Sequence, residues 1–136
     1  MRILIDSDVL LDAALNRQPF FEHSANLLNR AQQGELEAFI AWHSISNLYF
    51  ICSSGMDDAT VRGFLEALFS FARIAPVQTA DMLRALSLNM TDFEDAMQAA
   101  AALACNADVI ATRNLKDYVK SPIRARRPKD ILCELK

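Results

Sequence analysis

The stretch RILIDSDVLLDA, residues 2–13, begins as a strand and ends as a helix. Arg2–Ile5 form a short apolar run with branched side chains, which is typical of a buried parallel strand. Asp6 stands where this strand ends, and a helix is expected from about Asp8 to a break near Pro19. Ligands of parallel sheets bind beyond the carboxyl ends of the strands, so Asp6 is the first candidate site residue.

Further strands and helices alternate along the rest of the chain. Strands are predicted at residues 37–41, 73–77, 107–112 and 124–126. Helices are predicted at residues 22–33, 44–50, 57–69 and 80–86, with two more that start at residues 91 and 128. This alternation predicts an α/β sandwich with a mainly parallel sheet.

The sequence TDFEDAMQAAAALA, residues 91–104, raises a question, because three acids open a helix that is otherwise almost apolar. Thr91 and Glu94 fit the S/T-x-x-E capping box. Asp92 lies in the predicted first turn, where a negative charge favours the positive end of the helix dipole. These three residues therefore have ordinary structural roles in the prediction.

Asp95 has no such role. The residues four and seven positions further on, Ala99 and Ala102, make its face of the helix apolar. A carboxylate on a packed face is unfavourable unless it is hydrogen-bonded, paired or bound to a cation. The helix leads into the strand at 107–112, so we expect Asp95 at the same sheet edge as Asp6, facing a shared cation.

Composition limits the class of protein. A chain of 136 residues that is 52% hydrophobic suits one domain spanning residues 1–136. No apolar run reaches the roughly 18 residues of a membrane span, and no cleavable signal opens the chain. Cys52, Cys105 and Cys133 lack metal-binding or disulfide spacing and are interpreted as reduced thiols of a cytoplasmic protein with no membrane partner.

The net charge of −3 conceals a basic segment near the C-terminus, in which only Asp117 opposes seven cations. Such a segment is usually a solvated surface, but beside an acidic pocket it could hold a phosphate backbone. The seven residues are Arg113, Lys116, Lys120, Arg124, Arg126, Arg127 and Lys129.

Two motifs resemble those of a known family. ILIDSDVLLDA (residues 3–13) resembles the first motif of PIN domains, a strand followed by D-[ST]-[ND]-h-h-h-D. DFEDAMQAAAALACNADVIATRNLKDY (residues 92–118) resembles their later motif, which ends in T-R-[ND]-x-x-D-[FY]. The chain is most similar to bacterial VapC-like PIN proteins, which include the toxin ribonucleases of toxin–antitoxin pairs.

The resemblance implies a three-layer α/β/α sandwich and a Mg²⁺- or Mn²⁺-dependent ribonuclease that acts on single-stranded RNA. Asp6 matches the family's first metal ligand, Asp95 the ligand on the helix, and Ser7 the small hydroxyl residue. Asp117 and Asp92 are expected to complete the metal site. Asp6, Asp95 and Asp117 are the predicted catalytic residues, and an antitoxin is a possible protein partner.

Two positions depart from the family pattern. Asn47 stands where a helical Glu is usual, and Asn114 stands directly after T-R, where the last acid often lies. Asp117, one turn later, can substitute for that acid. We expect Asn47, Thr112 and Asn114, together with Ser7, to line the pocket that holds the three catalytic acids. The basic residues Arg113, Lys116, Arg124, Arg126 and Arg127 are the predicted RNA contacts.

Two alternatives stay open. In a haloacid-dehalogenase-like phosphatase, Asp6 would be the nucleophile and Asp8 the general acid, although the Gly-Thr pair that normally follows is missing. Lys116 and Asp95 would be their later partners. In a non-enzyme, a PIN-like domain binds RNA or a partner with little cleavage, and the missing carboxylates at Asn47 and Asn114 favour this alternative.

Three further expectations concern single features. Asp8 is interpreted as a helix cap. Asp12 could approach the site but is interpreted as solvated. Residues 64–71 carry an apolar cluster that is mostly core. Its exposed remainder could form a homodimer or antitoxin surface.

Overall fold

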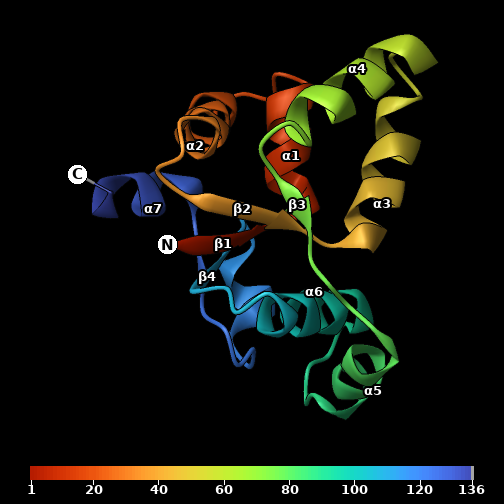
Figure 1. Cartoon of the computed structure of the whole chain (residues 1–136), viewed down its shortest axis with the longest axis vertical. Coiled ribbons are helices and arrows are strands. Elements are labelled where there is room, and N and C mark those ends of the chain that lie inside the picture. Colours follow the sequence, from red (N-terminus) through yellow and green to blue (C-terminus); the bar gives the residue numbers. More distant parts are fainter. Residues whose placement is uncertain (136) are drawn as a thin grey trace.

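The computed structural model describes residues 1–135 and has a central sheet of five strands (Figure 1). Every neighbouring pair is parallel, in the order β3-β2-β1-β4-β5. The strands are β1 (Arg2–Ile5), β2 (Glu37–Ile40), β3 (Arg73–Ile74), β4 (Val109–Ala111) and β5 (Ala125–Arg126). The predicted parallel sheet is confirmed, and β3, which is shorter than the predicted strand at residues 73–77, lies at one edge of it.

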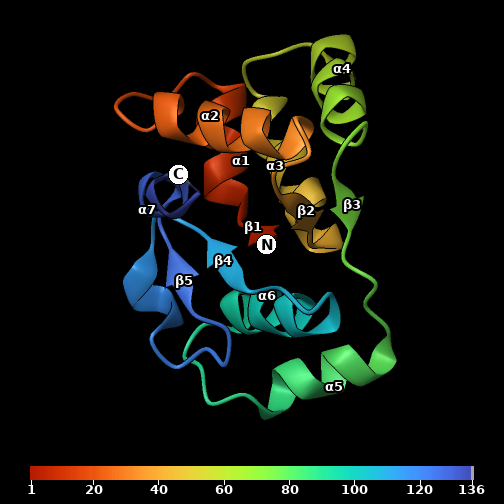
Figure 2. The ribbon, with the colours of Figure 1, turned by 60° about the vertical axis from the view of Figure 1, so that its left-hand side comes forward.

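Helices cover both faces of the sheet. Helices α1, α2, α3, α4 and α7 lie on one face, whereas α6 lies on the other with α5 outside it (Figures 1 and 2). Their bounds are α1 (Ser7–Ala14), α2 (Phe21–Gln32), α3 (Trp42–Cys52), α4 (Asp58–Leu68), α5 (Thr79–Ser87), α6 (Phe93–Ala104) and α7 (Pro128–Glu134); a short 3-10 helix, η1, covers Leu115–Tyr118. The chain therefore forms the expected three-layer α/β/α sandwich.

The alternation of side chains along β1 explains why the run is continuously apolar. Ile3 and Ile5 pack into the core beneath α1, α2, α3, α4 and α7, whereas Leu4 packs into the core beneath α6. All three are fully buried. Burial of one such side chain stabilises a fold by about 1.5–3 kcal/mol. Alanines line the buried face of α6, so its backbone can approach the sheet closely.

The order of the strands places a switch point next to β1. The chain moves outward from β1 to β2 and β3, then crosses back to β4 and β5 on the other side. The carboxyl ends of β1 and β4 therefore meet where the strand order reverses, which is where ligands bind in such sheets. The backbone N–H of Asp6 donates to the carbonyl of Ala111 at 3.0 Å, which fixes the two ends side by side.

Two helix starts differ from the prediction. Asp92 is the N-cap of α6 and accepts a hydrogen bond from the backbone N–H of Asp95 at 3.0 Å, so the predicted capping box of Thr91 and Glu94 is wrong. Asp6, and not Asp8, caps α1 through the N–H of Ser7. In both cases a short carboxylate follows extended backbone and reaches the first free N–H groups.

Two other expectations also change. Helix α3 begins at Trp42, two residues earlier than the predicted cap at Ser44, and its N-cap residue Ala41 makes no side-chain bond. The apolar cluster at residues 64–71 packs against the core, and none of its large side chains is fully exposed. The most exposed aromatic residues lie elsewhere, at Trp42 and Phe50. Within residues 1–135, no helix is long and apolar enough to cross a membrane.

Candidate acidic active site

The carboxylate of Asp6 accepts hydrogen bonds from four parts of the fold. Oδ1 accepts from the N–H of Ser7 at 2.8 Å and from Nε2 of Gln98 on α6 at 2.9 Å. Oδ2 accepts from Oγ1 of Thr112, just after β4, at 2.9 Å and from the hydroxyl of Tyr118 on η1 at 3.0 Å. Asp6 is only 9% exposed. Its orientation is therefore fixed by donors on both oxygens.

Asp8 holds the turn after β4 against α1. Its Oδ2 accepts from the backbone N–H of Arg113 at 2.9 Å and from Nδ2 of Asn114 at 3.3 Å. Burial raises the pKa of Asp8 to about 6, and the negative charge of Asp6 acts in the same direction. Asp8 is thus a second acid of the site, and its side chain does not cap the helix.

Asp12 is fully buried, contrary to the expectation that it is solvated. Its carboxylate forms a bidentate salt bridge with Arg113, at 2.6 Å to Nε and 3.1 Å to Nη2. Asp12 is buried and not solvated because the polar side of α1 faces the turn after β4. Breaking such a buried pair by removing one partner typically destabilises a protein by about 3–5 kcal/mol.

Asp92, Asp95 and Asp117 line one cavity of about 270 Å³. Burial raises the pKa of Asp95 to about 6, and the negative charges of Asp92 and Asp117 act in the same direction. The charge of Asp6 adds to this effect, whereas the nearby hydroxyl of Tyr118 lowers the pKa of Asp95. The predicted acids therefore interact electrostatically at the sheet edge where the switch point lies.

The predicted pocket walls are only partly brought together. Asn47 lines a separate pocket with Phe93, and its Nδ2 donates to Oγ of Ser7 at 3.4 Å. Asn114 is exposed and turned toward Asp8. Asn47 and Asp95 line different hollows, and both hollows adjoin the start of α6, so a common wall around the acids stays a prediction.

The basic segment does not form one surface. Lys116 and Lys120 line the acidic cavity. Arg126 forms a salt bridge with Glu134, and Arg124 lies 4.0 Å from the same carboxylate. Of the predicted RNA contacts, Lys116 and Arg127 line cavities and form no salt bridge in the described part of the chain, whereas Arg113 lines a cavity but also pairs with Asp12.

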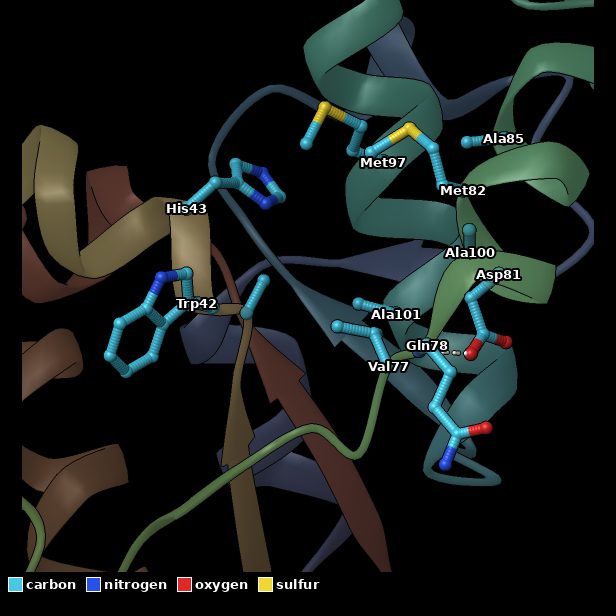
Figure 3. A pocket seen from close by; sticks show the side chains of 11 residues that line it. Trp42, His43, Val77, Gln78, Asp81, Met82, Ala85, Met97, Ala100 and Ala101 are labelled. Carbon is cyan, nitrogen blue, oxygen red and sulfur yellow. Dashed lines mark hydrogen bonds between the residues drawn. The ribbon is translucent and has the colours of Figure 1, made fainter.

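A second cavity, of about 170 Å³, lies between α3, α5 and α6 (Figure 3). Its walls are mainly apolar and include Trp42 and Met97. Burial lowers the pKa of His43, another wall residue. The carboxylate of Asp81 is already used, because it accepts from the backbone N–H of Gln78 at 2.8 Å. This cavity has no pair of free carboxylates and is not a second acidic site.

Comparison with known proteins identifies the family. A family model described as the PIN domain matches residues 2–116, which is most of the chain. The chain belongs to the PIN domain family. No curated protein sequence matches the chain at a significant level.

Solved structures show the same fold. One similar structure is VapBC2 from Rickettsia felis bound to a DNA fragment from its promoter. Its TM-score is 0.71 and its sequence identity is 16%, and the alignment covers 93% of this chain and 98% of that chain. VapBC-1 from nontypeable Haemophilus influenzae has a TM-score of 0.69 and 13% sequence identity, and the alignment covers 95% of this chain and 99% of that chain. FitAcB from Neisseria gonorrhoeae has a TM-score of 0.64 and 14% sequence identity, and the alignment covers 93% of this chain and 98% of that chain. Membership of the PIN family leaves the haloacid-dehalogenase alternative without support.

Two residues of this PIN domain's site were missed by the sequence analysis. Gln98 is fully buried and donates both to Asp6 and, at 2.8 Å, to Oγ of Ser44. The sequence could have indicated Gln98, because it is the only polar residue between Asp95 and the end of the helix. Tyr118 occupies the aromatic position that ends the second motif. Burial and the charges of nearby carboxylates raise its pKa, so its hydroxyl stays protonated and donates.

The donor set fits a hard divalent ion held mainly by water and a few carboxylates. Within residues 1–135, no group of three or more His, Cys, Asp or Glu side chains forms a ready-made metal cage. Mg²⁺ typically needs only one or two carboxylates, with waters and phosphate as the other ligands. Oδ1 of Asp8 and Oε1 of Gln98 are buried without a hydrogen-bond donor in the described chain, which leaves oxygen ligands beside Asp6.

The raised pKa of Asp95 gives a pH-dependent prediction. Because its pKa rises from 3.8 to about 6 on folding, the carboxylate destabilises the fold above about pH 6, and this penalty disappears as the pH falls below about 4. In EDTA at about pH 7.5, Asp95→Asn should raise Tm by about 2–4 °C, which allows for solvent screening. Melting scans from about pH 4 to 7.5 measure this.

The matched control is Glu66→Gln, which removes an exposed acid from α4. Its Tm should follow that of the wild type at every pH. A gain from Asp95→Asn that is equally large at about pH 4 would contradict a titrating carboxylate.

Proposed function

We propose that this PIN domain is a Mg²⁺- or Mn²⁺-dependent endoribonuclease that hydrolyses single-stranded RNA. The observation that carries the proposal is the convergence of Asp92, Asp95 and Asp117 on one cavity near Asp6, where the negative charges of the other three acids help to raise the pKa of Asp95. Acids that repel one another in this way are stabilised by a bound cation. The catalytic residues in this proposal are Asp6, Asp95 and Asp117.

Asp6, Asp95 and Asp117 would hold the divalent ion, and Asp92 would complete its shell directly or through water. When bound, such an ion polarises a phosphodiester and makes water a better nucleophile at neutral pH. The protein contributes orientation: Thr112 and Tyr118 hold Oδ2 of Asp6, and Gln98 holds Oδ1. A carboxylate fixed in this manner loses little freedom when it binds a ligand.

Basic residues near the acids would bind the RNA backbone. Lys116 lies in the same cavity as Asp95 and can contact the phosphate next to the cleaved bond. Arg113, in the turn after β4, and Arg127, at the start of α7, line a neighbouring hollow. Arg124 and Arg126 belong to the proposed RNA contacts as well, but their proximity to Glu134 predicts a smaller contribution to affinity.

Protein partners are part of the proposal. The similar structures of VapBC2, VapBC-1 and FitAcB support an antitoxin as partner of this chain. Homodimer formation also stays a prediction. Phe50 and Trp42 are 78% and 70% exposed, and the pockets beside them share His43 and Met97. Exposed aromatic residues next to apolar pockets favour a protein contact at this surface.

A binding domain with little cleavage is the second candidate function. All four hydrogen bonds to Asp6 come from protein donors, so an incoming cation must compete with Thr112 or Tyr118 for Oδ2. Asn47 and Asn114 add no negative charge to attract it. These observations favour weak metal binding, and a cleavage assay separates the two functions.

The proposed function predicts metal-dependent cleavage of a pool of single-stranded and structured RNAs. The wild type should cut unpaired regions in Mn²⁺ or Mg²⁺, and EDTA should stop the reaction. Asp6→Asn and Asp95→Asn should each lower the rate at least about 100-fold, because each removes a proposed ligand of the ion. Circular dichroism melts establish that the variants are folded.

Asp58→Asn is the control for this assay, because Asp58 is exposed on α4 and pairs with Arg62. Its rate should equal that of the wild type. Cleavage that persists in EDTA, or in the purified Asp95→Asn variant, would contradict the metal-dependent mechanism. Mn²⁺ binding by calorimetry without any cleavage would instead establish the binding domain.

Asn114 allows the charge of the site to be tested. Its Nδ2 donates to Oδ2 of Asp8 at 3.3 Å, so Asn114→Asp would place two carboxylates in contact. The variant should have a lower Tm in EDTA, and Mn²⁺ should bind it more tightly and raise its Tm more. Melting scans with and without Mn²⁺ and calorimetric titration measure both effects. An unchanged Tm in EDTA together with unchanged Mn²⁺ affinity would show that position 114 lies outside the metal site.

A further inference from the structure

Helices α2 and α7 pack side by side (Figures 1 and 2). A groove runs along them, lined by residues of both helices. The groove consists of two adjoining hollows of about 470 and 500 Å³, which share His23 and Lys129 as wall residues. The first hollow begins at Arg113, and the second continues along α2 to Gln33. The α2–α7 groove, as we call these two hollows, is separate from the acidic cavity.

The charge of the α2–α7 groove is the opposite of that of the acidic cavity. Arg113, Arg127 and Lys129 line its first hollow, and neither hollow has an Asp or Glu in its walls among residues 1–135. Arg127 and Lys129 are exposed and form no salt bridge in the described part of the chain. Arg113 uses two of its five N–H donors on Asp12. The groove therefore favours an anionic ligand.

An aromatic ring and a buried hydroxyl lie beside these cations. Phe20 is 40% exposed, and the guanidinium of Arg113 lies 4.0 Å from its ring centroid. Phe20 is also the N-cap of α2 and makes no side-chain cap bond, and the backbone N–H of Phe21 donates to the carbonyl of Arg17 at 2.7 Å. The hydroxyl of Ser24, in the same wall, is buried and has no partner within residues 1–135.

The second hollow has a different chemistry. Asn26, Asn29 and Gln33 provide side-chain amides along α2. Amides both donate and accept hydrogen bonds, so they suit the edges of nucleic-acid bases. A cationic entrance with an exposed aromatic ring, followed by an amide-lined channel, matches the composition of sites that bind single-stranded nucleic acid.

The α2–α7 groove begins one residue from the acidic site. Arg113 follows Thr112, which donates to Asp6, and the N–H of Arg113 donates to Asp8. We propose that the α2–α7 groove binds the nucleotides of single-stranded RNA that lie next to the cleaved phosphate. Arg113, Arg127 and Lys129 hold phosphates, and Phe20 stacks on a base. This inference rests on the proposed function for its choice of RNA, but binding to the groove requires no cleavage.

The test is a fluorescence anisotropy titration of a labelled, single-stranded RNA of about 12 nucleotides in EDTA. The double variant Arg127→Ala/Lys129→Ala should bind at least about five-fold more weakly than the wild type. The slope of log affinity against log salt should fall by about 1.4, which is about 0.7 for each cation removed. Both side chains are exposed, so the variant should fold normally.

The control variant is Arg62→Ala/Arg84→Ala, which removes the same charge from exposed positions on α4 and α5. It should retain the wild-type affinity within about two-fold, and retain the salt slope. If the wild type binds no RNA, or if the two double variants lose affinity and slope equally, the groove is not the RNA site.

A reporter on the ring gives an independent measurement. The chain has one tryptophan, so Phe20→Trp in a Trp42→Phe background places the only indole in the α2–α7 groove. RNA should quench its fluorescence through base stacking, and Arg127→Ala/Lys129→Ala should weaken this quenching. Binding seen by anisotropy without any quenching would overturn the proposal.

Cleavage separates the groove from the proposed nuclease activity. If groove variants lose RNA binding while the wild type never cuts RNA in Mn²⁺, the groove is an RNA site and the nuclease proposal fails. If the wild type cuts RNA and the groove variant does so with unchanged KM, the nuclease proposal stands and the groove proposal fails.

Discussion

The carboxylate of Asp6 is the point at which the fold and the site depend on each other. Four donors from α1, α6, η1 and the end of β4 converge on its two oxygens. A buried carboxylate is strongly unfavourable without such partners, so the elements that carry them must meet at the switch point between β1 and β4. The fold thus orients Asp6, and Asp6 in turn fixes the position of Tyr118 and Gln98 beside Asp95.

The turn after β4 joins two surfaces of opposite charge. Thr112 faces Asp6, whereas the side chain of Arg113 runs across the buried Asp12 to Phe20 at the entrance of the α2–α7 groove. Acids that gather on one side favour a cation, and cations that gather on the other favour phosphate. Three successive residues, Thr112 to Asn114, therefore connect a proposed metal site to a proposed RNA site without any large domain movement.

Much of the fold, and part of the site, follows from sequence. The apolar run of β1, the alternation of strands with helices and the alanine face of α6 indicated a parallel sheet with Asp6 and Asp95 near one edge, because strand ends and helix starts obey local rules. The burial of Asp12 could not be predicted, since its partner Arg113 lies 101 residues away. The position of Asn47 depends on how α3 packs, which no local pattern determines. Gln98 was recognisable as a polar residue on an apolar helix, but its hydrogen bond to Asp6 could not be predicted from the sequence.

The central claim is that a divalent ion binds where Asp6, Asp95 and Asp117 approach one another. Paramagnetic broadening of backbone amide signals by Mn²⁺ tests this without any substrate. Substoichiometric Mn²⁺ should first remove the signals around these three acids and around Tyr118, while those of α4, including Val61, stay sharp. The same titration on Asp95→Asn should require far more Mn²⁺. Broadening centred elsewhere, or identical titrations for the two proteins, would contradict the account.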